Sequence, residues 1–296
     1  MGGGGTYYDR DVTDKTQRTS RGFSTVAEEK LSRDRADPAL RPYKRKIICN
    51  NKSPIVFAFD VTGSMGNLPK IIYDKMPMIA GQIVEQGYLD DPIVSLAAIG
   101  DILCDEAPIQ IGDFALVRNL DEWLQRIWLE GGGGGHAKES YEFTIYFYAR
   151  NCEIPNAETP FFIITGDEGF REKLLATDLR ERFGGEHESI DSQTVFEELK
   201  QKFQNNVFLV HRYYSGADAK IVKQWEDTLG KEKVIRLGSD LAIADTILGI
   251  FALVTGSRTL DEYLQDMKNR GQTRERIAEV KKSLEPLAAS LQGITR

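Results

Sequence analysis

The chain has 296 residues, of which 41% are hydrophobic and 28% charged, as in ordinary globular proteins. Its formal net charge of −7 argues against a general nucleic-acid-binding protein, because such proteins carry a basic surplus. The three cysteines are too few and too scattered for a disulfide framework or a CxxC zinc site. We therefore expect a reducing, cytoplasmic compartment, and the N-terminus shows no apolar segment of a secretory signal.

Three regions of different character follow one another along the chain. Residues 1–46 are polar and mixed in charge, and are expected to form an arm that is disordered or draped over the domain. Residues 47–256 have a regular apolar pattern and are expected to form the main domain. Residues 257–296 hold two amphipathic segments, which predict a helical C-terminal extension docked on that domain.

Short apolar runs rich in β-branched residues predict strands that are covered on both faces. These strands are expected at residues 55–59, 93–99, 109–114, 161–165, 207–211 and 234–237. Helices are expected at residues 68–83, 120–127, 141–148, 195–203, 221–229 and 241–254. The alternation predicts an α/β fold with a doubly wound, mostly parallel six-stranded sheet and helices on both faces. The short link at residues 100–108 predicts a hairpin, and hence one antiparallel edge strand.

Oxygen-bearing side chains follow three of the expected strands. Asp60 ends the first strand, Asp101 follows the second and Asp167 follows the fourth. In open parallel sheets ligands bind at the carboxyl ends of strands, and carboxylates gathered there repel each other unless a cation lies between them. Thr62 and Ser64 add hydroxyl oxygens from the loop of Asp60. We therefore predict a Mg²⁺ site (or Mn²⁺ or Ca²⁺) at this edge, with Asp60, Thr62 and Ser64 among its oxygen ligands.

The segment DVTGSM at residues 60–65 resembles the metal-ion-dependent adhesion site of von Willebrand factor A (VWA) domains. That site is written DxSxS, followed by a distant Thr and a distant Asp. Thr62 stands for the middle serine and keeps the hydroxyl, and the distant Asp maps onto Asp167 in TGDE. The resemblance covers residues 50–255 and is to intracellular microbial members. It implies a non-catalytic module whose metal recruits an acidic residue of a partner protein.

The distant threonine of that pattern is missing from the corresponding loop, which reads LEGGGGGHAKESYEF. This loop resembles the GGGDGPED-type loop of some intracellular VWA proteins, which implies Glu139 as a direct or indirect metal ligand. Ser140 or water are the alternatives at this position. Asp101 and Glu168 are further candidates for supporting the ligands.

The glycine run in the same loop is expected to face the partner, because glycine lets a backbone approach where a Cβ would block it. The predicted partner-facing residues are Gly133, Gly134, Gly135 and His136. Intracellular microbial VWA proteins often resemble adaptors that work beside AAA+ ATPases of the MoxR type, so the resemblance implies such a protein partner. Neither nucleic acid nor a membrane span is expected.

A metal-dependent phosphatase of the haloacid-dehalogenase type, with Asp60 as its nucleophile, is the main alternative function. That family needs a second acid two residues later, where this chain has Thr62, and a late acid where it has Arg171. Arg171 and Lys173 are instead expected to be solvated charges on a helix. The three histidines lie near no Ser or Cys motif, so a hydrolytic triad has no support and enzyme activity is not expected.

Overall fold

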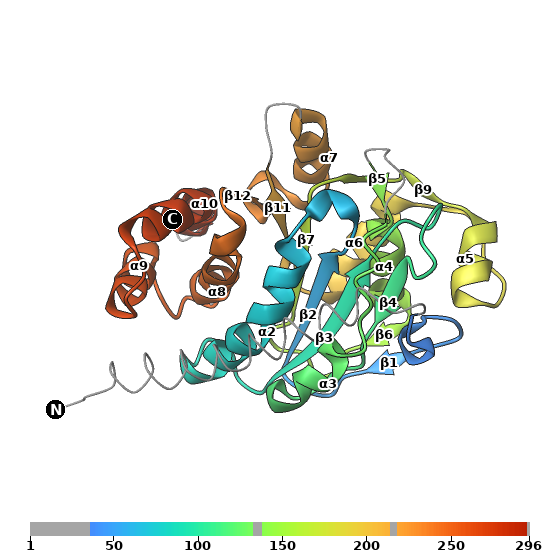
Figure 1. The fold of residues 1–296 in the computed structure, drawn as a ribbon, viewed down its shortest axis with the longest axis horizontal. Coiled ribbons are helices and arrows are strands. Elements are labelled where there is room, and N and C mark those ends of the chain that lie inside the picture. The colour runs from blue at the N-terminus through green and yellow to red at the C-terminus, as the bar shows by residue number, and fades with distance from the viewer. Residues whose placement is uncertain (1–35, 133–137, 214–217, 295–296) are drawn as a thin grey trace.

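The computed structural model describes residues 36–132, 138–213 and 218–294 (Figure 1). Residues 1–35 of the predicted N-terminal arm therefore lie outside the described residues. The rest of that segment contacts the domain: Leu40, in the 3₁₀ turn η1 (Pro38–Leu40), is fully buried. Just before this turn, the carboxylate of Asp37 forms an ion pair with Arg126 over 2.7 Å. The predicted boundaries at residues 46 and 256 stay predictions.

A six-stranded sheet forms the centre of the molecule, with the order β12-β11-β7-β2-β3-β4. All neighbours run parallel except β3 and β4, which are antiparallel. The predicted fold class, including the antiparallel edge strand, is confirmed. The strands are β2 (Ser53–Asp60), β3 (Pro92–Ile99), β4 (Ile109–Ile111), β7 (Phe161–Gly166), β11 (Val207–Arg212) and β12 (Val234–Leu237).

Three pairs of two-residue strands lie outside this sheet. One parallel pair joins β1 to β6, a second parallel pair joins β5 to β8, and an antiparallel pair joins β9 to β10. Their bounds are β1 (Ile47–Ile48), β5 (Lys138–Glu139), β6 (Cys152–Glu153), β8 (Gly169–Phe170), β9 (Lys173–Leu174) and β10 (Ile190–Asp191).

The strand order reverses between β2 and β7. From β2 the chain continues to β3 and β4 on one side, and it then returns to β7, β11 and β12 on the other. Phe59 of β2 pairs with Thr165 of β7, so Asp60 and Gly166 end their strands at the same level. The loops after β2 and β7 therefore meet at a topological switch point, where open α/β sheets bind ligands.

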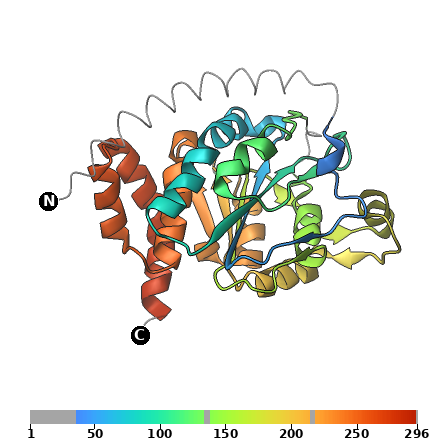
Figure 2. The ribbon, with the colours of Figure 1, turned by 90° about the horizontal axis from the view of Figure 1, so that it is seen from below.

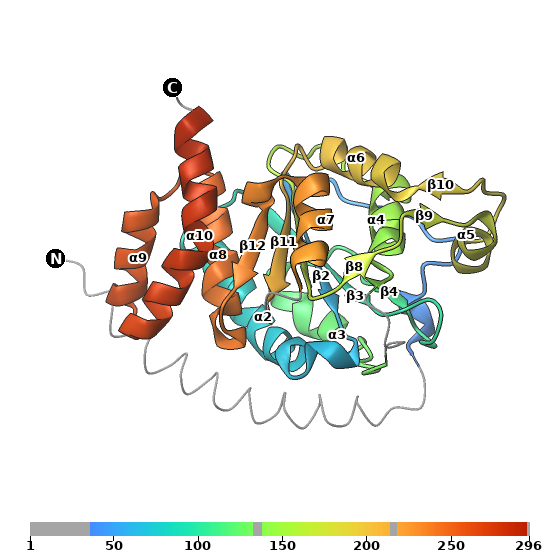
Figure 3. The same ribbon diagram turned by 90° about the horizontal axis from the view of Figure 1, so that it is seen from above.

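Helices cover both faces of the sheet (Figures 1 and 3). The first face packs against α2 (Leu68–Glu85), α3 (Leu120–Leu124) and α8 (Ile243–Val254). The second face packs against α4 (Tyr141–Arg150), α6 (Ser192–Lys202) and α7 (Ala219–Leu229), and α5 (Ala176–Phe183) adds its apolar side to the same core.

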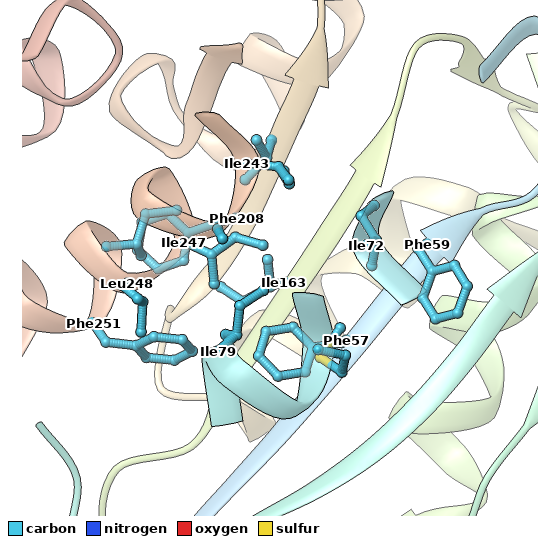
Figure 4. Close-up of a cluster of buried hydrophobic side chains, with 14 of the residues drawn as sticks. Phe57, Phe59, Ile72, Ile79, Ile163, Phe208, Ile243, Ile247, Leu248 and Phe251 are labelled. Carbon is cyan, nitrogen blue, oxygen red and sulfur yellow. The ribbon is translucent and has the colours of Figure 1, made fainter. Parts of the chain in front are cut away.

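Alternate residues of β2 divide between the two cores, as the two-residue repeat of a strand requires. Phe57 and Phe59 enter the first core, and Val56 and Ala58 enter the second. Figure 4 shows the first core, where apolar side chains of α2 and α8 meet those of the central strands. Phe57 contacts Phe251 of α8 edge to face, with ring centroids 6.2 Å apart.

The C-terminal segment forms α9 (Leu260–Asn269) and α10 (Arg274–Ile294), which lie together at the β12 end of the sheet (Figures 2 and 3). Thr259 and Glu262 form a capping box that starts α9. Gly249 of α8 has no Cβ where Leu284 of α10 and Tyr263 of α9 approach, so the three helices pack closely. Among the described residues, no helix has both the length and the apolar character needed to cross a membrane.

Candidate metal site at the carboxyl edge of the sheet

The loop after β2 gathers the hydroxyl groups of Thr62 and Ser64 beside Asp60. Asp60 is fully buried, and its Oδ1 accepts hydrogen bonds from the backbone N–H of Thr62 (2.8 Å) and from Thr62 Oγ1 (2.6 Å). The 3₁₀ turn η2 (Gly63–Met65) then places Ser64 Oγ 3.1 Å from Thr62 Oγ1. The DxTxS spacing thus puts three oxygen-bearing side chains next to one another.

The loop after β7 completes this group of oxygens. Ser64 Oγ donates a hydrogen bond to Asp167 Oδ1 over 3.0 Å. Asp167 is buried and Ser64 is exposed, so the group opens to solvent at Ser64. The structure therefore brings the four predicted metal ligands together in one continuous chain of contacts from Asp60 to Asp167.

Tyr141, the first residue of α4, holds Asp60 from a third element. Its phenol donates to Asp60 Oδ2 over 2.5 Å, and its ring lies edge-on to Trp225 with centroids 5.3 Å apart. A Cβ at position 166 would clash with the hydroxyl of Tyr141, which explains the glycine of the TGDE segment. In the sequence, Tyr141 only begins the helix expected at residues 141–148. Its place directly after Ser140, in the loop expected to supply the third motif, was the available signal.

Burial raises the pKa of both carboxyl groups of the site, Asp60 and Asp167. Burial is the main cause that raises the pKa of Asp60 to about 7, and the charge of Asp167 raises it further. Burial likewise raises the pKa of Asp167. Hydrogen bonds from Thr62 and Tyr141 oppose the effect on Asp60 but do not cancel it. The site therefore gains from positive charge placed between these carboxyl groups.

Glu139, the predicted replacement for the missing threonine, lies in β5, which pairs with β8 just after Asp167. It is 3% exposed, and its Oε2 is buried with no hydrogen-bond partner among the residues that the structure describes. Burial raises its pKa to about 9, with further contributions from the charges of Asp60, Asp101 and Asp105. A buried carboxyl oxygen without a donor beside Asp60 fits a bound cation or one of its waters.

Asp101 and Ser140, two further predicted supporting residues, both contact Arg171. The guanidinium group of Arg171 lies 2.5 Å from Asp101 Oδ1 and donates to Ser140 Oγ over 3.2 Å. Ser140 Oγ also accepts the backbone N–H of Ile102. These contacts neutralise Asp101 and tie the loop after β3 to the start of α4.

The prediction that Arg171 and Lys173 are solvated helix charges is wrong. Arg171 lies between β8 and β9, and its side chain is only 17% exposed. Lys173 is exposed but lies in β9. The local sequence shows no sign of the long-range partner of Arg171, Asp101, which is 70 residues away.

The remaining predicted site residues are Glu168 and those of the glycine run. Glu168 is half-buried, and its backbone carbonyl accepts a hydrogen bond from Trp225 Nε1 over 2.9 Å. The start of the glycine run contacts the DVTGSM loop, since the N–H of Gly63 donates to the carbonyl of Gly132 over 2.7 Å. The predicted partner-facing residues lie outside the described residues; they are Gly133, Gly134, Gly135 and His136.

Arg212, at the end of β11, braces the site from the other side. Its guanidinium group donates to the backbone carbonyl of Ser64 over 2.7 Å and forms a two-pronged ion pair with Asp240 at 2.9 and 3.0 Å. Its charge also opposes the rise in the pKa of Asp167. Sequence reasoning missed Arg212, although a cation that ends a buried strand was a visible signal.

The atoms available for metal coordination at this site suit a hard cation. Across residues 36–132, 138–213 and 218–294, no group of three or more His, Cys, Asp or Glu side chains forms a metal cage. The predicted ligands are instead two carboxylates and two hydroxyl groups, which are oxygen donors. Such a set fits Mg²⁺, Mn²⁺ or Ca²⁺ and does not fit a soft metal.

No family model and no curated protein matches the chain. Solved structures with partial similarity include the proximal thread matrix protein 1 of the mussel byssus, at 11% identity and a TM-score of 0.46 over 70% of this chain and 49% of that one. Another structure of this byssus protein is described as having a zinc-occupied MIDAS motif.

Two bacterial pilus proteins are also similar in part. The adhesin SpaC of Lactobacillus rhamnosus GG has 11% identity and a TM-score of 0.44 over 75% of this chain and 31% of that one. A D319A mutant of the minor pilin PilB of Streptococcus sanguinis has 13% identity and a TM-score of 0.47 over 71% of this chain and 62% of that one. The chain thus spans less than two thirds of the length of each of these proteins.

Proposed function

We propose that the chain is a protein-binding module of the VWA type that depends on a divalent cation, with Mg²⁺ as the resident ion. The proposed ligands are Asp60, Thr62, Ser64 and Asp167, with Glu139 beside them. One observation carries the proposal: the side chains of these four ligands form a continuous chain of contacts across the switch point of the sheet. A cation bound there supplies a coordination position for a carboxylate of the partner.

The residues of the site have separate tasks. Thr62 and Tyr141 occupy both oxygens of Asp60 and so fix its orientation. Ser64 is the exposed member, so a partner approaches the site from its side. Hydroxyl ligands cancel less of the charge of a cation than carboxylates would, which favours an acidic group on the partner.

The phosphatase alternative is not favoured by the geometry around Asp60. A nucleophilic carboxylate must reach the substrate, whereas Asp60 is fully buried. Where a phosphatase of that type has its general acid, Thr62 donates to Asp60 instead. The hydroxyl group of Thr62 thus favours a metal-binding site over a phosphatase site.

The proposed partner is a protein that presents an Asp or Glu side chain. A MoxR-type AAA+ ATPase remains the proposal that the resemblance to intracellular VWA proteins implies. Purification of the chain's partners in Mg²⁺ and, in parallel, in EDTA, followed by mass spectrometry, identifies the proteins held through the cation. Retention of the same partners in EDTA would contradict the proposed role of the cation.

The cation itself is tested by thermal unfolding with Mg²⁺, Mn²⁺, Ca²⁺ or EDTA. A ligand that binds the folded state raises its stability by mass action, so at least one of these ions is expected to raise Tm. Ser64→Ala removes an exposed ligand without opening the core, and is expected to remove this rise. Ser290→Ala on α10 is the matched control and is expected to keep it. An equal rise in both variants would refute the site.

A further inference from the structure

A groove of about 670 Å³ lies between α7, the edge strand β12 and α10. Val234, Leu237, Tyr213 and Pro286 give it apolar walls. Figure 3 shows α10 and α7 on the two sides of the β12 end of the sheet. Its volume falls in the range of pockets that hold ligand side chains and small molecules.

We propose that this groove is the second half of the docking site: it takes an apolar side chain of the same partner segment whose acidic residue reaches the cation. The inference rests on the proposed function. The occupant is an extended protein segment with an acidic residue, an apolar residue and further negative charge beyond it.

The groove lies next to the residues that brace the candidate metal site. Tyr213 in its wall directly follows Arg212, which donates to the carbonyl of Ser64 over 2.7 Å. From the other wall, Leu237 and Gly238 lead into Asp240, the ion-pair partner of Arg212. One bound segment can therefore contact the exposed hydroxyl side of the site and the groove together.

The walls of the groove offer apolar surface together with polar backbone groups. Tyr213 is 40% exposed, and the guanidinium group of Arg236 lies over its ring at 5.6 Å. Ser283 of α10 donates to the carbonyl of Arg236 over 2.8 Å and so links α10 to the strand. Pro286 has no N–H, so the carbonyl of Lys282 lacks its usual helical donor and can accept a hydrogen bond from a bound segment.

The charges around the groove favour an acidic occupant. Two acidic residues of the lining are paired: Glu226 lies 3.4 Å from Arg236, and Glu279 lies 3.7 Å from Arg276. Lys231 and Lys282 are exposed and form no ion pair with any residue that the structure describes. Their uncompensated positive charge complements a segment with negative charge.

Gly238 offers a way to fill the groove without straining the fold. It is exposed, and a Cβ built on it meets no atom within 4 Å. Gly238→Trp is therefore expected to fold and to occupy the groove. Gly293 on α10 is equally exposed and equally open but does not line the groove, so Gly293→Trp is the matched control.

The probe is a displayed library of random peptides, selected on the full chain in Mg²⁺ and eluted with EDTA. Enriched peptides are expected to share an acidic residue and an apolar residue at a constant spacing. Fluorescence polarisation then gives their Kd for each variant. Gly238→Trp is expected to raise Kd about tenfold to a hundredfold, the range for loss of one buried apolar side chain, and Gly293→Trp is expected to leave it unchanged.

The outcomes separate the two proposals. If EDTA-sensitive peptides bind Gly238→Trp as tightly as the natural chain, the groove proposal is wrong and the cation-dependent function stands. If no EDTA-sensitive peptide is enriched, the proposed function fails and the groove proposal fails with it. Lys282→Glu adds a second check: it is expected to weaken the same peptides at low salt, and Lys281→Glu, outside the groove, is expected not to.

Discussion

The phenol of Tyr141 donates a hydrogen bond to Asp60 Oδ2 over 2.5 Å, although the two residues are 81 positions apart in the chain. Asp60 Oδ1 is held by Thr62 in its own loop, so the two oxygens of one carboxylate are fixed by two different elements. The start of α4, just after the loop that lacks the threonine of the VWA pattern, thus reaches the site through a tyrosine that holds Asp60 in place.

Tyr141→Phe is expected to lower both the stability of the fold and the affinity for the cation. The variant leaves Asp60 Oδ2 buried without a donor, which costs about 1–3 kcal/mol. It also frees the carboxylate to turn away from the site. The free energy of unfolding in urea measures the first effect, and the Mg²⁺ concentration that half-saturates the rise in Tm measures the second.

Tyr148→Phe is the matched control, because Tyr148 is also a fully buried tyrosine of α4 whose hydroxyl is hydrogen-bonded, to Ser95 at 2.6 Å. Both variants are expected to lose stability, but only Tyr141→Phe is expected to lose affinity for Mg²⁺. Equal Mg²⁺ affinity in the two variants would show that Tyr141 has a purely structural role.

The cation-free chain is expected to lose stability as the pH rises from about 4 to about 9. Burial raises the pKa of Asp60 to about 7 and that of Glu139 to about 9, so the folded state holds protons that the unfolded state has released. Stability therefore falls as the pH rises through this window, on the order of 2–4 kcal/mol from Asp60 alone. Urea unfolding in EDTA at a series of pH values measures the slope.

Saturating Mg²⁺ is expected to flatten this pH dependence at its alkaline end, because the cation favours the ionised carboxylates. Asp60→Asn is the control that removes one of the titrating groups. In EDTA it is expected to show a shallower slope than the natural chain between pH 4 and 7. A slope that Asp60→Asn leaves unchanged would mean that other groups set the pH dependence.

The central sheet and the meeting of Asp60 with Asp167 could be predicted from the sequence for one physical reason. Buried parallel strands have continuous apolar runs in their sequence, and their carboxyl ends share one edge of the sheet. The ends of elements were less predictable. The strand expected at residues 109–114 ends at Ile111, although the N–H of Gly112 still donates to the carbonyl of Leu96, and the helix expected at residues 120–127 ends at Leu124.

The supporting residues of the site could not be predicted, because their partners are distant and their own elements are short. The pair of β5 and β8 has two residues in each strand, too few for any periodic signal. Arg171 directly follows β8, so the position of its side chain beside Asp101 depends on this short strand pair. Tyr141 only begins the helix expected at residues 141–148; only the fold shows that its hydroxyl reaches Asp60.

Arg171→Met is expected to destabilise the fold by about 3–5 kcal/mol, because it leaves the buried carboxylate of Asp101 without its cation. The substitution also removes the guanidinium group that lies 3.8 Å from Glu142 Oε1, while the backbone N–H of residue 171 still donates to Glu142 Oε2. Lys173→Met, two positions away and exposed, is the matched control and is expected to change stability little. The free energy of unfolding in urea compares them. Similar values for the two variants would mean that the ion pair adds nothing to the fold.

Leu284→Ala in α10 tests whether the C-terminal helices are part of the domain's cooperative core. Leu284 is fully buried in the same apolar cluster as α2 and α8, and it packs where Gly249 lacks a Cβ. Its truncation is expected to cost about 2–5 kcal/mol and to keep unfolding a single transition, since the removed atoms leave a cavity. Leu103→Ala, 66% exposed, is the control and is expected to change stability by less than about 0.5 kcal/mol. A second, earlier transition in Leu284→Ala would instead show that α9 and α10 unfold on their own.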